Sequence, residues 1–281
     1  GPKMTFSTAA VTDLWARGYG ALPCPQRVQL EVGECPLTSE WSVAADGSVD
    51  PAALACLTAG LQEIFGSPPA TANPGARCIM LSQKPGTVAP DASEGIARQG
   101  YRIRVTGDRV DVTGNAGAGL FYGVQTLLQM LRPCAGGRAG TLPVGVIEDW
   151  PDRELRIIHY DTKHHQDRLE SVKDMISRAA SFKINGLAWE IEDKFAYEKH
   201  PVIGAPGAFT AAQMCEITEH ALRHHVEIIP IVQGPSHLAF VLKHEEFAHL
   251  REDRANNYML CPSNDECYEL LFSMYDELIA A

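Results

Sequence analysis

The regular alternation of strand and helix patterns after Trp150 is the feature that most limits how this chain can fold. Apolar strands are predicted at 155–160, 184–191 and 226–232, and helical patterns at 169–182 and 211–224 separate them. A further helix is predicted at 264–279. Strands that alternate with helices at this spacing form a parallel sheet with right-handed crossovers. Periodicity alone does not decide between a barrel and an open sheet.

Three strand–helix units leave a sheet with unpaired edges and a partly uncovered core. A TIM (β/α)8 barrel needs eight such units. We therefore expect residues 149–281 to be the first three βα units of a truncated barrel, the catalytic domain of a larger α/β protein. We also expect the remaining barrel segment, or an oligomer partner, to cover the sheet edge.

A different pattern precedes this region. Strand alternation at 28–32, a predicted hairpin at 101–112 and an amphipathic helix at 119–131 indicate a small α+β domain over residues 22–148. The Pro- and Gly-rich stretch 133–143 is expected to close it. Gly1-Pro2 is typical of a protease-cleavage remnant, so residues 1–21 are predicted to hold that remnant and an N-terminal leader.

Composition excludes some classes of function. The net charge of -11 offers no basic stripe for a phosphate backbone, so nucleic acid is not expected as a partner. No apolar run approaches the roughly 20 residues that span a bilayer, so no membrane partner is expected. The eight cysteines lack CxxC or zinc spacing and are predicted to be free buried thiols. The compartment stays open, with a periplasmic or secreted location slightly favoured.

Polar residues follow all three predicted strands. In a parallel α/β array ligands bind at the carboxyl ends of the strands, so this coincidence predicts an active site there. Arg156, early in the first strand, should have a carboxylate or ligand partner because an unpaired buried guanidinium is costly. The residues at the strand ends are Asp161, Lys163, His164 and His165, then Glu190, Glu192 and Asp193, then Gln233, Ser236 and His237.

Several other motifs have a plainer interpretation. The glycines at 114–119 suggest a tight turn before a helix rather than a dinucleotide loop, because no βαβ unit surrounds them. The pair His220 and His224 has i,i+4 spacing, for which a solvated helix edge is the better explanation. His244 and His249 lack the spacing of a zinc motif. A metal held by the histidines and aspartate at 159–165 stays a minority alternative.

Motifs in both regions match one enzyme family in order and spacing. They lie at 101–112, 119–129 (GLFYGVQTLLQ), 149–161 (DWPDRELRIIHYD), 183–185 (KIN) and 230–237 (PIVQGPSH). With these motifs the chain resembles glycoside hydrolase family 20, the β-N-acetylhexosaminidases. The resemblance covers a non-catalytic α+β domain and the entry to a catalytic barrel.

The resemblance implies a retaining exo-β-N-acetylhexosaminidase that removes terminal N-acetylglucosamine or N-acetylgalactosamine from glycans. In the family the acetamido oxygen of the sugar attacks its own anomeric carbon, so no metal or other cofactor is implied. An Asp-Glu pair after the fourth strand orients the acetamido group and protonates the leaving oxygen. This pair is expected to lie beyond residue 281.

The residues that can be carried over form a supporting shell. Arg156 matches the arginine that grips sugar hydroxyls. Asp193 and His237 match a carboxylate and a histidine that pair with each other in the family and tune the acid. The full set of expected substrate-binding residues is Arg156, Asp161, His165, Glu190, Glu192 and Gln233.

The chain also departs from the family pattern. The usual Asp-Asp-Gln-Gly-Trp loop is replaced by EDKFAY at 192–197, and Ile231 stands where an acidic residue is usual. Trp189 or Tyr197 could provide an aromatic platform for a sugar, or simply pack in the core. A non-catalytic carbohydrate-binding protein on the same scaffold, and a metal-dependent hydrolase, therefore remain alternatives.

Overall fold

The structure is a computed structural model that describes residues 14–71, 77–132 and 139–281. Contacts between Cα atoms divide the chain into two units. The first unit runs to Glu154 and also includes Ser181–Lys183, and the second unit contains Leu155–Ala180 and Ile184–Ala281. Among the described residues no helix is long and apolar enough to cross a membrane.

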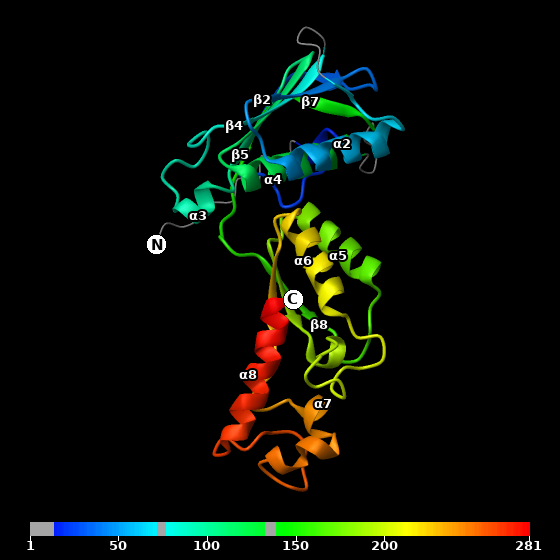
Figure 1. Cartoon of the computed structure of the whole chain (residues 1–281). Helices are drawn as coiled ribbons and strands as arrows, with labels where there is room; N and C mark the ends of the chain where they lie inside the picture. The colour runs from blue at the N-terminus through cyan, green and yellow to red at the C-terminus, as the bar shows by residue number, and fades with distance from the viewer. Residues whose placement is uncertain (1–13, 72–76, 133–138) are drawn as a thin grey trace. The chain divides into compact units, whose positions relative to one another are not determined.

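The first unit is built on a seven-stranded mixed sheet in the order β1-β7-β5-β6-β4-β2-β3. Figure 1 shows its helices α2 (Pro51–Phe65) and α4 (Gly117–Leu131) next to each other along the sheet. A short helix, α3 (Glu94–Ala97), lies before β5 in the chain. The strands are β1 (Arg27–Pro36), β2 (Ser42–Asp46), β3 (Ala70–Thr71), β4 (Cys78–Gln83), β5 (Tyr101–Val105), β6 (Arg109–Gly114) and β7 (Thr141–Asp149).

Helix α4 forms the centre of this unit, and nearly all of its residues are buried. It begins just after β6, and the sharp turn between them requires glycine. A Cβ on Gly114 would lie 2.2 Å from the backbone nitrogen of Leu120, and one on Gly119 would lie 2.2 Å from the carbonyl oxygen of Gly100. The glycine run at 114–119 is therefore a structural turn, as predicted.

The predicted hairpin is confirmed as the antiparallel pair β5 and β6, closed by a hydrogen bond of 2.8 Å from the Thr106 N–H to the Arg109 carbonyl. The prediction that the stretch 133–143 closes the first domain is wrong for its last three residues, because these belong to a strand of that domain. Strand β7 begins at Thr141 and pairs with both β1 and β5. Residues 133–138 lie outside the described part of the chain.

A buried polar cluster lies within the first unit. The ammonium of Lys183 donates to Asp149 Oδ2 and to the hydroxyl of Tyr101, both at 2.9 Å. The Tyr101 hydroxyl also lies 2.8 Å from Asp149 Oδ2 and 2.6 Å from the hydroxyl of Thr126. The side chains of Lys183 and Asp149 are only 7% and 9% exposed. Burial raises the pKa of Tyr101, so its hydroxyl keeps its proton.

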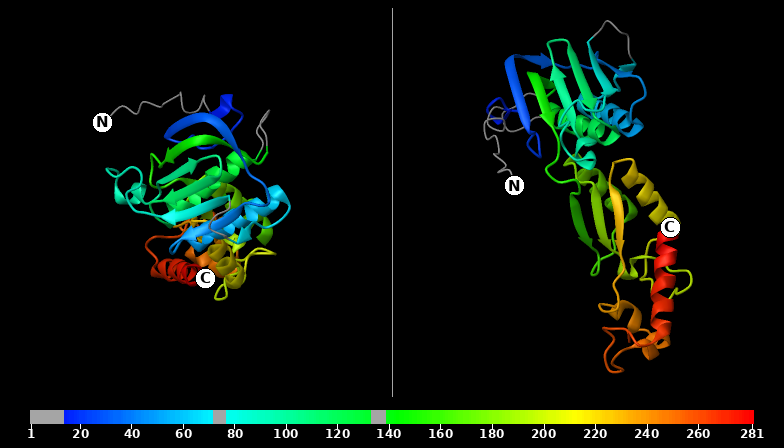
Figure 2. Two further views of the ribbon diagram at one scale, coloured as in Figure 1. Left: turned by 90° about the horizontal axis from the view of Figure 1, so that it is seen from above. Right: turned by 90° about the vertical axis from the view of Figure 1, so that its left-hand side faces the viewer.

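The second unit contains a three-stranded parallel sheet in the order β10-β9-β8. Its strands are β8 (Ile157–Asp161), β9 (Gly186–Glu190) and β10 (Glu227–Ile231), which lie side by side in the right-hand view of Figure 2. The crossover helices are α5 (Leu169–Ser181) and α6 (Ala211–Leu222). The predicted parallel βα order is confirmed, and each strand is shorter than its predicted range.

The remaining elements of this unit follow β9 and β10. They are the 3-10 helix η1 (Glu192–Lys194), α7 (Ala239–Leu242), η2 (Glu245–Leu250) and α8 (Asp265–Ala280). A capping box begins α6, where the Thr210 hydroxyl accepts from the Gln213 N–H at 3.3 Å and the Gln213 side chain accepts from the Thr210 N–H. At the start of α8, Asn264 is the N-cap and its side chain accepts from the Glu266 N–H.

Candidate active site at the strand ends

The carboxyl ends of the three parallel strands meet at one edge of the sheet. Asp161, the last residue of β8, pairs in register with Glu190, the last residue of β9, which pairs with Ile231 at the end of β10. The residues that follow these positions therefore start from the same edge. This register brings the polar residues that follow the three strands to one edge of the sheet, as the sequence predicts.

Glu190 is the centre of the cluster. Its carboxylate accepts from the ammonium of Lys163 at 2.6 Å, lies 2.8 Å from His159 Nε2, and has a side-chain hydrogen bond with Gln233. The Lys163 hydrogen bond, followed by those of Gln233 and His159, holds the pKa of Glu190 below its usual range, although burial of the carboxyl opposes this. Glu190 is thus kept as a carboxylate in a largely buried place.

Lys163 links two of the strand ends. Its ammonium lies 2.8 Å from Asp161 Oδ2 as well as 2.6 Å from Glu190 Oε2. Hydrogen bonds to these two carboxylates raise the pKa of Lys163, and the Lys163 hydrogen bonds lower the pKa of Asp161. Lys163 is one of the polar residues after the first predicted strand, but no pattern in the sequence indicates that its ammonium links two strand ends.

Buried aromatic side chains lie next to this cluster in the chain. Trp189 is fully buried and packs against the rings of Tyr160 and Phe209, with centroid distances of 5.3 and 5.7 Å. Its indole N–H donates to the Thr162 hydroxyl at 3.0 Å, and this hydroxyl donates to the carbonyl of Glu190 at 2.9 Å. Tyr197 is also buried, with 1% exposure. Both aromatic residues therefore pack in the core, and neither presents a sugar platform in this structure.

Glu192 differs from the other carboxyls of the cluster. It is buried, and its backbone lies in the left-handed region at φ 45° as β9 turns into η1. Burial raises the pKa of Glu192 to about 7, and Asp193, Glu190 and Asp161 add to this effect while Lys163 opposes it. A carboxyl with this pKa holds its proton in part at neutral pH and can donate as well as accept a hydrogen bond.

Three of the predicted site residues have partners outside the Glu190 cluster. His165 lies 3.1 Å from Asp167, which also bonds to the Tyr160 hydroxyl. Asp193 pairs with the ammonium of Lys194 at 2.5 Å. His237, with φ 61°, has the Tyr258 hydroxyl 2.8 Å from its Nε2. Tyr258 lies in a loop after η2, and nothing in the sequence connects it with His237.

Arg156 lies directly before β8 and is half-buried. Its backbone N–H donates to the Asn185 side chain at 2.7 Å. In the same region the Asn185 N–H donates to the Arg156 carbonyl at 3.0 Å. Asn185 thereby holds the start of β8 beside the start of β9, which is a structural reason for the asparagine of the KIN motif.

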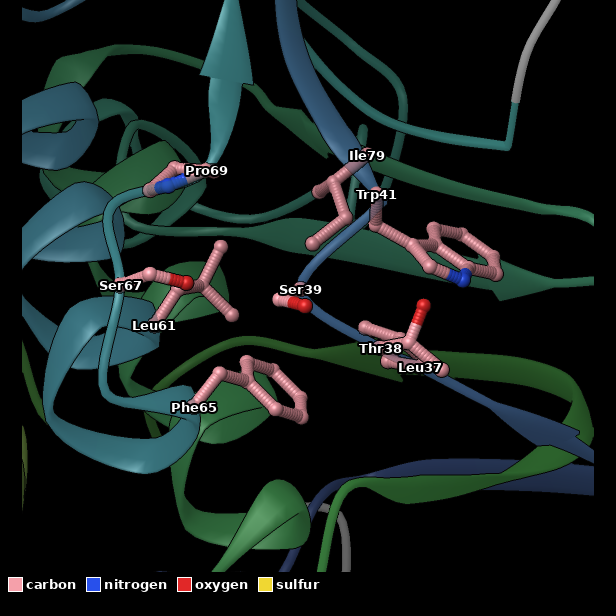
Figure 3. Close-up of a pocket in the computed structure, with 9 residues that line it drawn as sticks. All are labelled: Leu37, Thr38, Ser39, Trp41, Leu61, Phe65, Ser67, Pro69 and Ile79. Atoms are coloured by element: carbon pink, nitrogen blue, oxygen red, sulfur yellow. The ribbon is translucent and has the colours of Figure 1, made fainter.

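A small pocket in the first unit is too limited for a sugar site. Figure 3 shows its lining, with Phe65, Leu61 and Trp41 around a space of about 220 Å³ that includes open solvent. Small-molecule sites typically occupy about 300–1,000 Å³ and carry several convergent polar groups. The strand ends of the second unit are therefore the better candidate site.

Two family models match the chain. The model described as glycosyl hydrolase family 20, domain 2, matches residues 19–150, and the model described as the catalytic domain of the same family matches residues 154–281. The chain belongs to glycoside hydrolase family 20. Its second unit is accordingly a stretch of the family's TIM-barrel catalytic domain. TIM-barrel enzymes in general carry their active sites at the C-terminal ends of the strands.

Individual curated and solved relatives are consistent with this assignment. Hexosaminidase D of Bos taurus is 32% identical over 126 residues, which are 44% of this chain and 36% of that protein. The solved β-N-acetylhexosaminidase of Streptomyces coelicolor A3(2) is 26% identical with a TM-score of 0.77, and the match covers 92% of this chain and 57% of that chain. A mutant β-hexosaminidase of Streptomyces plicatus in complex with the product GlcNAc is also 26% identical, with a TM-score of 0.77, 92% of this chain and 56% of that one covered. The chain thus spans about half the length of its solved relatives.

The pairing that family 20 implies for Asp193 and His237 does not form in this structure. Asp193 has the adjacent Lys194 and, at 4.0 Å, Lys243 as its cationic partners, while His237 bonds to Tyr258. Lys194 stands where the usual loop of the family has its glutamine, directly after the second aspartate, Asp193. This substitution supplies a competing cation for Asp193 and accounts for the difference.

The other sequence expectations concern residues outside the strand ends. In the described part of the chain, no group of three or more His, Cys, Asp and Glu side chains is arranged to hold a metal ion. The seven described cysteines are free, and Cys24 and Cys215 are exposed rather than buried. Cys134 lies outside the described residues. His220 and His224 are half-buried against α5 and not at a solvated edge, which corrects that prediction.

Proposed function

We propose that this chain supplies the front part of a retaining exo-β-N-acetylhexosaminidase, which removes terminal N-acetylglucosamine or N-acetylgalactosamine by substrate-assisted catalysis. The observation that carries the proposal is the Glu190 network at the strand ends of a family 20 catalytic domain. A fixed carboxylate with a neighbouring ammonium offers strong acceptors and donors to sugar hydroxyls.

The charges of the cluster suit the binding of a neutral sugar. Lys163 forms ion pairs with both Glu190 and Asp161, and Lys194 forms one with Asp193, so each of these groups is held in place before the ligand arrives. Binding groups that are already oriented cost less entropy when the ligand binds. Near pH 7 the carboxyl of Glu192 keeps its proton in part, so it can donate a hydrogen bond to the ligand.

The resemblance assigns the chemical step to an Asp-Glu pair after a fourth barrel strand. On this proposal the 281 residues provide the supporting shell, in which Arg156, Asp161, His165, Glu190, Glu192 and Gln233 contact the sugar. Asp193 and His237 act indirectly, by positioning and tuning the acid. The 281-residue chain by itself is then expected to bind sugar weakly and to turn over no substrate.

Hydrolysis of aryl glycosides tests this proposal. We expect no release of 4-nitrophenol from the N-acetyl-β-glucosaminide by the 281-residue chain, and release by a longer protein that completes the barrel and includes the Asp-Glu pair. The matched 4-nitrophenyl β-glucoside lacks the acetamido group and should not be hydrolysed by either, because the substrate supplies the nucleophile. Turnover by a chain of confirmed mass that ends at Ala281 would contradict the assignment of the acid pair.

Binding separates the enzyme from a carbohydrate-binding protein. In the longer protein, Glu190→Gln should weaken competitive inhibition by GlcNAc by at least about tenfold, since a hydrogen bond to a charged group contributes about 1.5–3 kcal/mol. Asp174→Asn on the exposed face of α5 is the matched control and should leave it unchanged. Retained GlcNAc binding without any hydrolysis in the longer protein would favour the non-catalytic alternative.

A further inference from the structure

The carboxyl of Glu192 is buried without a hydrogen bond. The residue is only 8% exposed. Within the described ranges its carboxyl has neither a hydrogen-bond donor nor an ion-pair partner, whereas the carboxylate of Glu190, two residues earlier, bonds to Lys163 and His159. A buried polar group without a partner is uncommon and costly in a folded protein. The carboxyl of Glu192 is therefore a candidate for direct contact with a ligand.

This carboxyl is open to solvent on one side and is not sealed in the core. Neither of its oxygens is among the fully enclosed, unpartnered side-chain atoms of the described segments, which belong to Trp41, Gln99, Gln166 and His244. Both oxygens therefore touch water, although little else of the residue does. Since Glu192 directly follows the end of β9, a sugar that lies over the strand ends would displace that water.

Most of the charges that act on Glu192 have its own sign. Lys163 attracts the carboxylate form, and three neighbouring carboxylates repel it. Lys163 is already bonded to two of these carboxylates, at 2.6 and 2.8 Å. Helix α7, which packs against η1, has no titratable side chain of its own. The charged groups in the surroundings are Lys163 after β8, Asp161 and Glu190 at the ends of β8 and β9, Asp193 and Lys194 on η1, and Lys243 after α7.

We propose that the binding of a neutral sugar at the strand ends takes up one proton from solvent at Glu192, whose carboxyl then donates a hydrogen bond to a sugar oxygen. The proton joins one carboxyl oxygen, and no covalent bond of the sugar changes. Exclusion of water strengthens the repulsion from the three neighbouring carboxylates, while Lys163 is shared with two of them, so the complex favours the neutral carboxyl. A neutral carboxyl also supplies a donor, which the ionised Glu190 does not.

The pH dependence of sugar binding tests this inference, which rests on the proposed function. The probe is methyl N-acetyl-β-glucosaminide, a neutral sugar, and its binding to the 281-residue chain is followed by NMR. Burial raises the pKa of Glu192 to about 7, so the protonated fraction falls from about nine-tenths at pH 6 to about one-tenth at pH 8. If the protonated form is the one that binds, the dissociation constant should rise about tenfold over this range. At pH 8, addition of the sugar to an unbuffered solution should consume about one proton per bound sugar.

A pair of variants assigns the proton to its residue. Glu192→Gln is neutral at both pH values, so its dissociation constant should be the same at pH 6 and pH 8. Glu219→Gln on α6 is the matched control, because the Glu219 side chain is 63% exposed and lies on a helix away from η1 in the sequence. This control should keep the tenfold change.

The carboxyl carbon signal of Glu192 provides a second measurement that does not depend on variants. It should titrate near pH 7 in the free chain, and at pH 8 the sugar should move it to the protonated position. Equal dissociation constants at pH 6 and pH 8, or a tenfold change that persists in Glu192→Gln, would overturn this inference while the sugar site stands. Absence of sugar binding at both pH values would overturn the sugar site as well.

Discussion

Lys183→Met is expected to destabilise the first unit strongly. The substitution keeps the length and apolar volume of the side chain but removes the ammonium that lies 2.9 Å from Asp149 and from the Tyr101 hydroxyl. Asp149 then remains buried as a carboxylate with one fewer donor. Removing one partner of a buried ion pair costs about 3–5 kcal/mol. For a unit of this size, that free energy corresponds to a fall in Tm of roughly 6–20 °C.

Chemical denaturation followed by circular dichroism measures this effect. Lys84→Met is the matched control, because Lys84 forms an ion pair of 3.2 Å with Asp46 in the same unit, but both side chains are about 60% exposed. It should cost about 0–1 kcal/mol. The double variant Lys183→Met/Asp149→Asn should recover part of the loss, since no buried charge is left unpaired. A cost for Lys183→Met no larger than that of Lys84→Met would refute the reasoning.

Three further predictions concern the second unit. Glu192→Gln should stabilise the chain at pH 8 by about 1–3 kcal/mol, and this gain should vanish toward pH 4.5. The reason is that the raised pKa of Glu192 makes the folded state lose stability as the pH rises from 4.5 through about 7. A difference in urea unfolding between the two proteins that does not depend on pH would contradict this. Thr210→Ala should cost about 1 kcal/mol by removing the capping box of α6, whereas Thr218→Ala within the same helix should cost less in the same measurement. In a longer, active protein His237→Ala should lower kcat and shift the limb of the pH–rate profile that reports the acid, and an unchanged profile would argue against a tuning role.

The sequence was sufficient for the elements whose signal is local. Helix α4 and the hairpin of β5 and β6 follow from periodicity and turn residues within a few positions of each other. The gathering of Asp161 and Glu190 also followed, because parallel strands of similar length bring their ends to one edge. In these cases the cause is a pattern within one element, or the general rule for successive parallel strands.

The features that the sequence did not predict depend on distant partners. Strand β7 pairs with β1, more than 100 residues earlier in the chain, and no local pattern specifies that neighbour. The same applies to His237 and Tyr258, whose contact arises only when two loops fold together. The burial of Lys183 is a third case, because a lysine in a short motif gives no sign that its charge is enclosed.

Glu190 and Glu192 show how one short segment produces two kinds of carboxyl. They are separated by a single residue at the end of β9, and the sequence offers no reason to treat them differently. Glu190 ends a strand whose register places it beside Lys163, so its charge is compensated by a hydrogen bond of 2.6 Å. The backbone turns at Glu192, where burial outweighs the more distant attraction of Lys163. Backbone direction and not residue type therefore decides how the two pKa values diverge, and the strand end carries both an ionised acceptor and a carboxyl that keeps its proton in part at neutral pH.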